Sequence, residues 1–140
     1  MKEDPMKGIL FLCVHNSSRS QIAEGWARRL APAGVGVFSA GSEPLTVNPL
    51  AVRVMEEAGI DIGGQRSKRI DDVPEETIDT VVTLCAEEVC PVFPHPVERL
   101  HWPLPDPSAV KGDEAARLAA FRSARDDIER RLRALFAAAG

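Results

Sequence analysis

A short apolar run near the start of the chain leads through a polar loop into a helix. Residues 8–12 read GILFL, which is apolar enough and of the right length to predict a fully buried strand. The residues that follow the loop, 19–30, place three large side chains four positions apart, on one face of a helix: Ile22, Trp26 and Leu30. A buried strand joined directly to an amphipathic helix is the first half of a β-α-β unit, so this segment restricts the fold to the α/β class.

Polar residues mark the starts of three expected helices. Ser18 and Gln21 have the spacing of a capping box, in which each side chain satisfies a free backbone N–H of the other. Asn48 followed by Pro49 is typical of an N-cap with proline at the first helical position. Asp113 can cap the last helix, whose apolar residues also follow helical spacing. We therefore expect three α-helices.

Strands and helices alternate along the rest of the chain. Apolar and β-branched runs predict three further strands, at 35–41, 77–85 and 98–104. Residues 61–76 and 86–97 are expected to be loops, the second of them irregular because it is rich in proline. The alternation predicts a four-stranded parallel sheet in a single three-layer α/β/α domain over 1–140, in which residues 1–7 form a flexible extension.

Composition argues against several classes of protein. The 140 residues are 44% hydrophobic, which is ordinary for one folded domain and argues against disorder. The formal net charge of -4 and the lack of a polybasic block argue against nucleic acid or a membrane surface as partner. No apolar stretch has the length of a membrane span, and the first residues do not resemble a signal peptide. We expect a cytoplasmic protein, and nothing in the sequence requires more than a monomer.

The three cysteines point to chemistry rather than to a structural framework. Their odd number argues against a static set of disulfides. In the cytosol, disulfides are usually transient and part of catalysis. Cys13 and Cys85 each close a predicted strand, and Asp106 follows another strand. Because parallel sheets bind ligands at the carboxyl ends of their strands, these three residues are candidates for one site.

The stretch from Cys13 to Arg19 has the features of an oxyanion site. Its backbone N–H groups can curl around a tetrahedral anion at the helix start, and Arg19 can hold two anion oxygens with its planar fork. The same positive field stabilises a thiolate, since helix N-termini with basic neighbours lower the pKa of cysteines from ~8.5 to ~3.5–7.5. Ser20 can add a hydrogen bond to that thiolate, and Asn16 suits a loop position with a left-handed backbone. The residues expected to bind the oxyanion are Val14, His15, Asn16, Ser17, Ser18, Arg19 and Ser20.

Structural explanations also exist for these residue types. A cysteine at the end of a buried strand is often part of the core, and the C-x5-R pattern alone is short. We interpret His15 as a loop residue rather than as a general base. His95 and His101 have no partners at metal-ligand spacing in the sequence. The spacing of Cys85 and Cys90 is not that of a zinc site, so no metal site is expected.

The motifs along the chain resemble those of a known family. CVHNSSRSQIAEGW at 13–26, followed by FSAG, VMEEAGIDI, VVTLC, CP, HW and PDPS, is similar to the thioredoxin-coupled arsenate reductases. These share the flavodoxin-like fold of the low-molecular-weight protein tyrosine phosphatases. The resemblance extends from about Gly8 to the last helix, and the cysteine in VTLC with a later cysteine before proline indicates the reductase branch.

The resemblance implies a role for each cysteine. Cys13 would attack the arsenic of an arsenate held by the loop, and Asp106 would protonate the departing oxygen. Cys85 would attack the Cys13 adduct, which would release arsenite and leave a Cys13–Cys85 disulfide. Cys90 would then form a Cys85–Cys90 disulfide that reduced thioredoxin opens by thiol–disulfide exchange. A mycothiol or glutaredoxin system could substitute as reductant. The implied function is arsenic detoxification by an enzyme with no bound cofactor.

The chain departs from this family pattern in the spacing of two cysteines. Only four residues separate Cys85 from Cys90, fewer than the family usually has. A shorter segment limits how far Cys85 can move between its two partners. The transfer of the disulfide is therefore the step that this difference affects most.

A second departure concerns a cation site. Some relatives bind a potassium ion beside the anion loop, and Asn16, Ser39 and Glu24 match ligand positions there. Arg66 and Lys68 replace a hydroxyl and a carboxylate, and fixed cations repel an added one. We expect no potassium requirement.

Two other functions are open at this point. A phosphatase would use the same loop, Arg19 and Asp106, but water would resolve a phosphocysteine. Phosphotyrosine phosphatases of this fold look similar in having a tyrosine after the DP pair, whereas here Ser108 follows and the chain has no tyrosine. This difference weakens phosphotyrosine recognition but is compatible with residual phosphatase activity. A non-catalytic thiol protein that binds oxyanions or arsenite would need neither Asp106 nor the anion loop.

Overall fold

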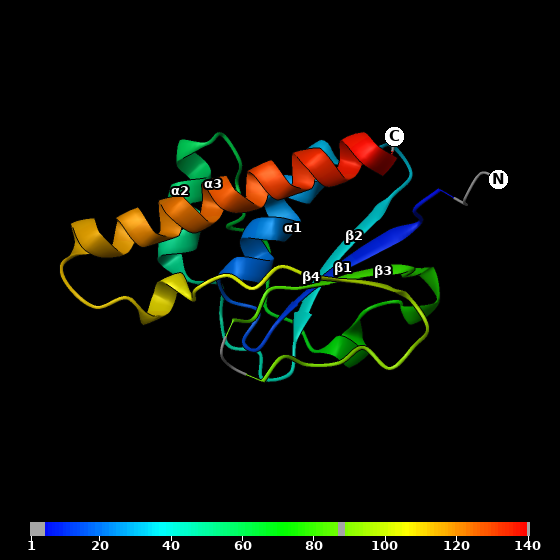
Figure 1. Ribbon diagram of the computed structural model, residues 1–140. Helices are drawn as coiled ribbons and strands as arrows, with labels where there is room; N and C mark the ends of the chain where they lie inside the picture. The colour runs from blue at the N-terminus through cyan, green and yellow to red at the C-terminus, as the bar shows by residue number, and fades with distance from the viewer. Residues whose placement is uncertain (1–4, 87–88, 140) are drawn as a thin grey trace.

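A four-stranded parallel sheet forms the centre of the protein (Figure 1). The computed structural model describes residues 5–86 and 89–139. The strands are β1 (Gly8–Cys13), β2 (Gly36–Gly41), β3 (Thr80–Thr83) and β4 (Glu98–His101). They lie in the order β2-β1-β3-β4, and every neighbouring pair is parallel. From β1 the chain first adds β2 on one side and then adds β3 and β4 on the other side of β1. In such sheets, ligand sites lie at the carboxyl ends of the strands, where the strand order reverses.

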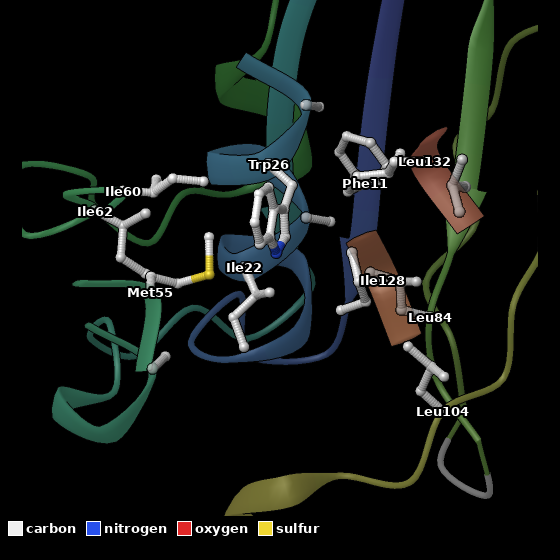
Figure 2. Packing of buried hydrophobic residues seen from close by; sticks show 14 of the residues in the cluster. Phe11, Ile22, Trp26, Met55, Ile60, Ile62, Leu84, Leu104, Ile128 and Leu132 are labelled. Atoms are coloured by element: carbon white, nitrogen blue, oxygen red, sulfur yellow. The ribbon is translucent and has the colours of Figure 1, made fainter. Parts of the chain in front are cut away.

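Three α-helices cover one face of the sheet. They are α1 (Arg19–Leu30), α2 (Pro49–Glu57) and α3 (Glu114–Ala139). Helices α1 and α3 lie against each other over the sheet, and α2 packs beside both of them (Figure 1). Ile9 and Phe11 of β1 point to this face and are fully buried. The ring of Trp26 lies between Met55 of α2 and Phe11, so one aromatic side chain joins two helices to the sheet (Figure 2).

The opposite face of the sheet is covered by short 3-10 helices and a loop. Leu10 and Leu12 point to this face, where they form a second core with Val81 and the fully buried ring of Phe93. The 3-10 helices near this core are η1 (Ile70–Asp72) and η2 (Glu75–Thr77). The predicted fold class is therefore confirmed, with α-helices in one covering layer and 3-10 helices in the other.

The predicted strands are found, but two of them are shorter than expected. Thr77 ends η2 instead of starting a strand, and β3 ends at Thr83. The last strand ends at His101 rather than at residue 104. The N–H of Trp102 still donates to the carbonyl oxygen of Thr83 at 2.8 Å, but Pro103 has no N–H and interrupts the ladder there.

Two of the three predicted helix caps are confirmed. The side chains of Asn48 and Asp113 each accept a hydrogen bond of 2.9 Å from a backbone N–H in the first turn of α2 and α3. The capping box at the start of α1 is wrong, because Ser18 makes no side-chain cap hydrogen bond. The amide of Gln21 instead donates to carbonyl groups of two loops, including that of Asn16 at 3.0 Å. Buried loop carbonyls need partners, and the Gln21 amide is the donor that reaches them.

The first residues of the described chain contact the body of the protein. Of the extension expected over 1–7, residues 1–4 lie outside the described residues. Met6 packs against the core, and the N–H of Lys7 donates to Asp79 Oδ2 at 2.8 Å. Over residues 5–86 and 89–139, no helix combines the length and the apolar character needed to cross a membrane.

Glu57, at the end of α2, joins this helix to α3. Its carboxylate accepts hydrogen bonds from Arg122 at 2.7 and 2.9 Å and from Arg125 at 3.0 Å. The hydrogen bond from Arg122 is the largest influence on the pKa of Glu57, which falls from 4.5 to about 2; desolvation opposes this fall and Arg125 adds to it. A carboxyl group with a depressed folded pKa adds stability above its unfolded pKa, and this contribution is lost as the pH falls through the folded value.

The Glu57→Gln variant is expected to melt about 1–4 °C below the wild type at neutral pH, because it loses the charged contacts to α3. The difference should shrink as the pH falls from 4.5 towards 2, since the wild-type carboxylate is protonated over that interval. Thermal unfolding by circular dichroism at several pH values measures it. The neighbouring exposed Glu56→Gln variant is the control and should show no such trend. An equal difference at neutral and acid pH would contradict the prediction.

Candidate active site

The predicted site residues gather at the carboxyl end of the sheet. Cys13 is the last residue of β1, and Arg19 is the first residue of α1. Asp106 precedes the short helix η3 (Pro107–Ala109) on the loop after β4. A small pocket at this place is lined by Cys13, His15, Ser17, Ser18, Arg19 and Asp106. The fold therefore brings the loop, the arginine and the carboxylate together from distant parts of the sequence.

The carbonyl groups of the anion loop (residues 14–18) are bonded to a neighbouring segment. Backbone N–H groups of residues 43, 45 and 48 donate to the carbonyl oxygens of Val14, His15 and Ser17 at 2.9, 3.1 and 2.8 Å. None of the described peptide bonds is cis. In a trans peptide the N–H points opposite to the C=O, so the N–H groups that follow these carbonyls point away from the neighbouring segment. They are available to an anion in the pocket.

Asn16 holds the middle of this loop. It has a left-handed backbone, with φ 49°, and is completely buried. Its Oδ1 accepts hydrogen bonds from the side chain of Gln21 at 3.0 Å and from the backbone N–H of Lys68 at 2.9 Å. Its carbonyl oxygen accepts from the hydroxyl of Ser67 at 2.6 Å. Partners on helix α1 and on the segment before η1 therefore fix the conformation of one loop residue.

The thiol of Cys13 faces the hydroxyl of Ser20. The two heavy atoms lie 2.8 Å apart, and Asn16 Nδ2 donates to the same hydroxyl oxygen at 2.7 Å. Because Ser20 Oγ already accepts this bond, its own proton can point to Cys13, and a thiolate there would accept it. Cys13 is a free cysteine and is 3% exposed. The sulfur of Cys13 is therefore the end of a series of two polar contacts that begins at the Asn16 amide.

The guanidinium of Arg19 is held by backbone carbonyls. Its Nη1 donates to the carbonyl oxygens of Leu84 at 3.2 Å and Leu104 at 2.8 Å. These two residues follow β3 and β4, so the arginine joins the loops at the ends of both strands. Arg19 is 4% exposed, and its charge therefore acts on the pocket with little screening by solvent.

Asp106 stands at the mouth of the pocket. Its Oδ1 accepts from the backbone N–H and the hydroxyl of Ser108, at 2.9 and 2.7 Å. Its Oδ2 lies 3.8 Å from Arg19 Nη2, and 27% of the side chain is exposed. One carboxyl oxygen is thus fixed by η3 while the other faces the arginine, a geometry that suits proton transfer to an oxygen of a bound anion.

The two remaining cysteines form a disulfide. Cys85 and Cys90 are linked with their Cα atoms 5.5 Å apart, so the short spacing between them accommodates the bond. Cys85 is buried, and it directly follows Leu84, whose carbonyl binds Arg19. Cys90 is partly exposed. The pair therefore joins a buried position, next in the chain to a residue that binds Arg19, to one that solvent reaches.

The histidines have other contacts. The Nδ1 atom of His15 lies 2.9 Å from the carbonyl oxygen of Glu43, which ties the anion loop to the segment after β2. His101 Nδ1 contacts the hydroxyl of Thr83 at 2.7 Å, and His95 contacts Glu75. No group of three histidine, cysteine or acidic side chains among the described residues could hold a metal ion.

Gly41, at the end of β2, was not among the predicted site residues. A Cβ atom at this position would lie 2.4 Å from the carbonyl oxygen of Val14 and 2.8 Å from that of Cys13. Since real Cβ contacts are not this short, any other residue would displace the anion loop. A glycine that closes a predicted strand is a sequence signal for such a close approach.

A parallel sheet that ends in a Cys-x5-Arg anion loop defines a class of proteins in which a thiolate attacks a bound oxyanion. The profile of the low molecular weight phosphotyrosine protein phosphatases matches residues 8–139, and the chain belongs to this family. It is 46% identical over 129 residues to the arsenate reductase of Halalkalibacterium halodurans, covering 91% of this chain and 93% of the relative. The arsenate reductase of Bacillus subtilis is equally similar, with the same identity and coverage.

Solved structures agree with these relatives. An arsenate reductase in the phosphate binding state has a TM-score of 0.81 at 35% identity, over 96% of this chain and 100% of that chain. A thioredoxin-dependent arsenate reductase of Corynebacterium glutamicum has a TM-score of 0.71 at 28% identity, over 99% of this chain and 64% of that chain. The resemblance drawn from the sequence is confirmed.

The Gly41→Ala variant is expected to lose most of its oxyanion binding and about 1–3 kcal/mol of stability, because the added methyl group overlaps two carbonyl oxygens. Isothermal titration with arsenate and urea unfolding measure the two effects. Gly64→Ala is the matched control, since a Cβ atom there meets nothing within 4 Å. Wild-type affinity for arsenate in Gly41→Ala would contradict this account of the loop.

Proposed function

We propose that this protein reduces arsenate to arsenite, with Cys13 as nucleophile and a Cys13–Cys85–Cys90 disulfide relay. The observation that carries the proposal is a free cysteine directly before the anion loop together with a disulfide pair in the segment after the neighbouring strand β3. The three thiols serve one two-electron reduction. The relatives of this protein that are named arsenate reductase support the choice of arsenate as substrate.

The first step forms a bond between sulfur and arsenic. The Cys13 thiolate attacks the arsenic atom of arsenate, whose oxygens bind the loop N–H groups and Arg19. One oxygen leaves with a proton from Asp106, as water. The backbone N–H groups and the buried guanidinium stabilise the negative charge of the bound anion and of the transition state. Arsenic is still pentavalent after this step.

The second step transfers the electrons. The Cys85 thiolate attacks Cys13 Sγ, a sulfur–sulfur bond forms, and the electron pair of the sulfur–arsenic bond stays on arsenic, which leaves as arsenite. Cys90 then attacks Cys85 and releases the Cys13 thiolate, which leaves the Cys85–Cys90 disulfide seen in the structure. A dithiol such as reduced thioredoxin reduces this disulfide and is itself oxidised. The partly exposed Cys90 is the sulfur that such a partner reaches first.

The setting of this reaction forms part of the proposal. We propose thioredoxin as the external reductant, a role that the thioredoxin-dependent relative supports. The protein would act as a cytoplasmic monomer without nucleic acid or membrane as partner, and without a bound cofactor. The net charge of -4 is in keeping with such a soluble setting.

Phosphatase activity is the second candidate, because the family and the anion loop allow it. A phosphocysteine on Cys13 would be hydrolysed by water, and Cys85 and Cys90 would have no part in the reaction. Ser108 follows the Asp106–Pro107 pair, and the chain has no tyrosine. The disulfide pair in the segment after β3 favours the reductase. A non-catalytic thiol protein would not need Asp106 or the buried guanidinium of Arg19.

A coupled assay tests the reductase. Reduced protein is mixed with arsenate, thioredoxin, thioredoxin reductase and NADPH, and the loss of NADPH is followed. The wild type is expected to oxidise NADPH in the presence of arsenate. The rate should be more than about 100-fold lower in Cys13→Ser and in Cys85→Ser, because each substitution removes a step of the relay. Cys90→Ser should release no more than one arsenite per protein.

The same variants exclude the alternatives. Hydrolysis of p-nitrophenyl phosphate should be lost in Cys13→Ser and kept in Cys85→Ser, because water needs no second thiol. Fast hydrolysis without any arsenate-dependent loss of NADPH would establish the phosphatase instead. Absence of both activities in the wild type would favour a binding protein.

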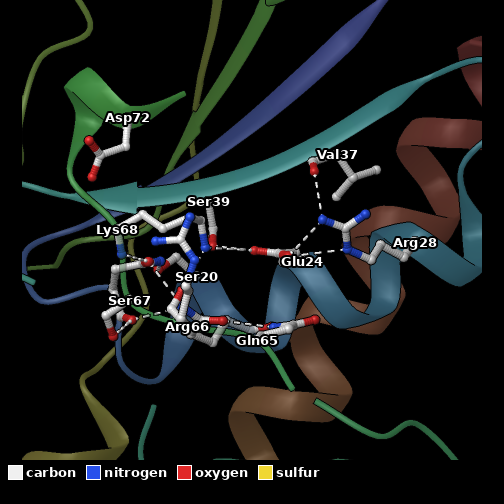
Figure 3. A network of polar contacts seen from close by, with 12 residues as sticks. Ser20, Glu24, Arg28, Val37, Ser39, Gln65, Arg66, Ser67, Lys68 and Asp72 are labelled. Atoms are coloured by element: carbon white, nitrogen blue, oxygen red, sulfur yellow. Dashed lines mark hydrogen bonds and ion pairs between the residues drawn. The ribbon is translucent and has the colours of Figure 1, made fainter. Parts of the chain in front are cut away.

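The residues at the potential potassium site do not fit a second cation. Lys68 Nζ lies 3.5 Å from Glu24 Oε1 and 2.6 Å from the carbonyl oxygen of Arg66 (Figure 3). The same Glu24 oxygen accepts the hydroxyl of Ser39 at 2.5 Å, and Asn16 Oδ1 accepts two N–H groups of the protein. The oxygens that a cation would need already have donors, and a fixed ammonium group lies among them.

We therefore expect arsenate reduction and the melting temperature to be the same in potassium chloride and in sodium chloride at equal ionic strength. The ammonium group of Lys68 would repel an added monovalent cation. Steady-state rates and thermal unfolding in the two salts measure this. A clear rise of either quantity in potassium would contradict the prediction.

A further inference from the structure

Lys68 places its charged group in a half-buried position on the segment that binds the anion loop. Its side chain is 15% exposed, and its ammonium group lies between the carboxylate of Glu24 and the carbonyl oxygen of Arg66 (Figure 3). Burial lowers the pKa of Lys68, and the charge of Glu24 opposes that change. Partial burial of a charged ammonium group costs free energy that an exposed lysine does not incur, so the contacts of Lys68 need an explanation.

Glu24 forms an ion pair with Lys68. Its side chain is 4% exposed, and the residue lies in α1. One oxygen accepts from the hydroxyl of Ser39 and faces Lys68; the other accepts from Arg28 at 2.8 and 3.1 Å. A buried carboxylate needs this compensation, because an unpaired charge in the interior is strongly destabilising. The group therefore links α1, β2 and the segment before η1.

The main chain of Lys68 extends this link to the anion loop. Its N–H donates to Asn16 Oδ1 at 2.9 Å, and its carbonyl oxygen accepts from the N–H of Gly41 at 2.9 Å. Asn16 in turn donates to Ser20 Oγ, which lies 2.8 Å from Cys13 Sγ. A continuous series of contacts thus runs from the buried ion pair to the nucleophile.

We propose that Lys68 is a positioning residue for Cys13. Its ammonium group is a fixed internal cation that holds residues 66–68 against α1, so that the Lys68 N–H keeps Asn16, and through it the Ser20 hydroxyl, in the geometry that stabilises the Cys13 thiolate. Without the charge, Glu24 loses a partner, and the bond from Gln21 to the carbonyl oxygen of Arg66 has to hold the 66–68 segment to α1 without the ion pair. The proposal deepens the proposed function, because the same loop binds the substrate, but the reactivity of Cys13 can be measured without arsenate.

The test uses the oxidised protein, in which Cys13 is the free thiol and the other two cysteines are joined. Alkylation of Cys13 by iodoacetamide is followed by mass spectrometry over a range of pH. Two variants remove the charge: Lys68→Met keeps the apolar stem of the side chain, and Lys68→Ala leaves space for an added amine. Lys111→Met, at an exposed lysine, is the matched control.

Both Lys68 variants are expected to alkylate about three- to tenfold more slowly at neutral pH, with a rate profile displaced to higher pH. Propylammonium chloride should restore much of the rate of Lys68→Ala, and sodium chloride should not, because an amine can replace the missing ammonium group and stem. Lys111→Met should behave as the wild type. In the arsenate assay, the Lys68 variants should show a comparable fall in kcat/KM.

Two results would overturn the proposal. One is a folded Lys68→Met variant that alkylates at the wild-type rate at every pH. The other is an equal loss in Lys68→Ala with and without propylammonium, which would assign the effect to packing alone. If Lys68→Ala does not fold, Lys68→Met decides the question. A wild type that fails to reduce arsenate would refute the proposed function and leave the alkylation result standing by itself.

Discussion

The left-handed conformation of Asn16 is the constraint on which the active site depends. An asparagine can adopt it at low cost, but the loop keeps it because three partners bind the residue: Gln21, Ser67 and the backbone of Lys68. With Asn16 fixed, its side-chain amide reaches the hydroxyl of Ser20, and that hydroxyl reaches Cys13. The loop that follows β1 is therefore held in one conformation, and the hydroxyl that faces the sulfur of Cys13 is held in place.

The electrostatics of the pocket come from burial rather than from a large number of charges. Arg19 is almost inaccessible to solvent, and carbonyl groups at the ends of two strands hold its guanidinium. The carbonyls of the anion loop are bonded to the segment after β2, which directs the N–H groups of the same peptides the other way. A net negative protein thus contains a small pocket lined by the buried Arg19, a setting that would favour a bound oxyanion.

The local elements could be predicted because their signals lie in neighbouring residues. The strand at 8–12, the helix at 19–30 and the caps at Asn48 and Asp113 all depend on short-range pattern. The predicted capping box of Ser18 and Gln21 was wrong because contacts with distant residues override the local pattern. The pattern is local, but the amide of Gln21 is drawn to carbonyl groups of segments that the sequence does not show to be close.

The sequence by itself determined the α/β class and the place of the Cys-x5-Arg loop between a strand and a helix, because that loop is a local arrangement. The tertiary structure alone decided what surrounds the loop. Gly41 touches the loop carbonyls, and the ammonium group of Lys68 lies beside Glu24, only because β2 and the segment before η1 are folded against α1. Contacts between residues far apart in the chain depend on how the layers pack, and no short-range pattern records that.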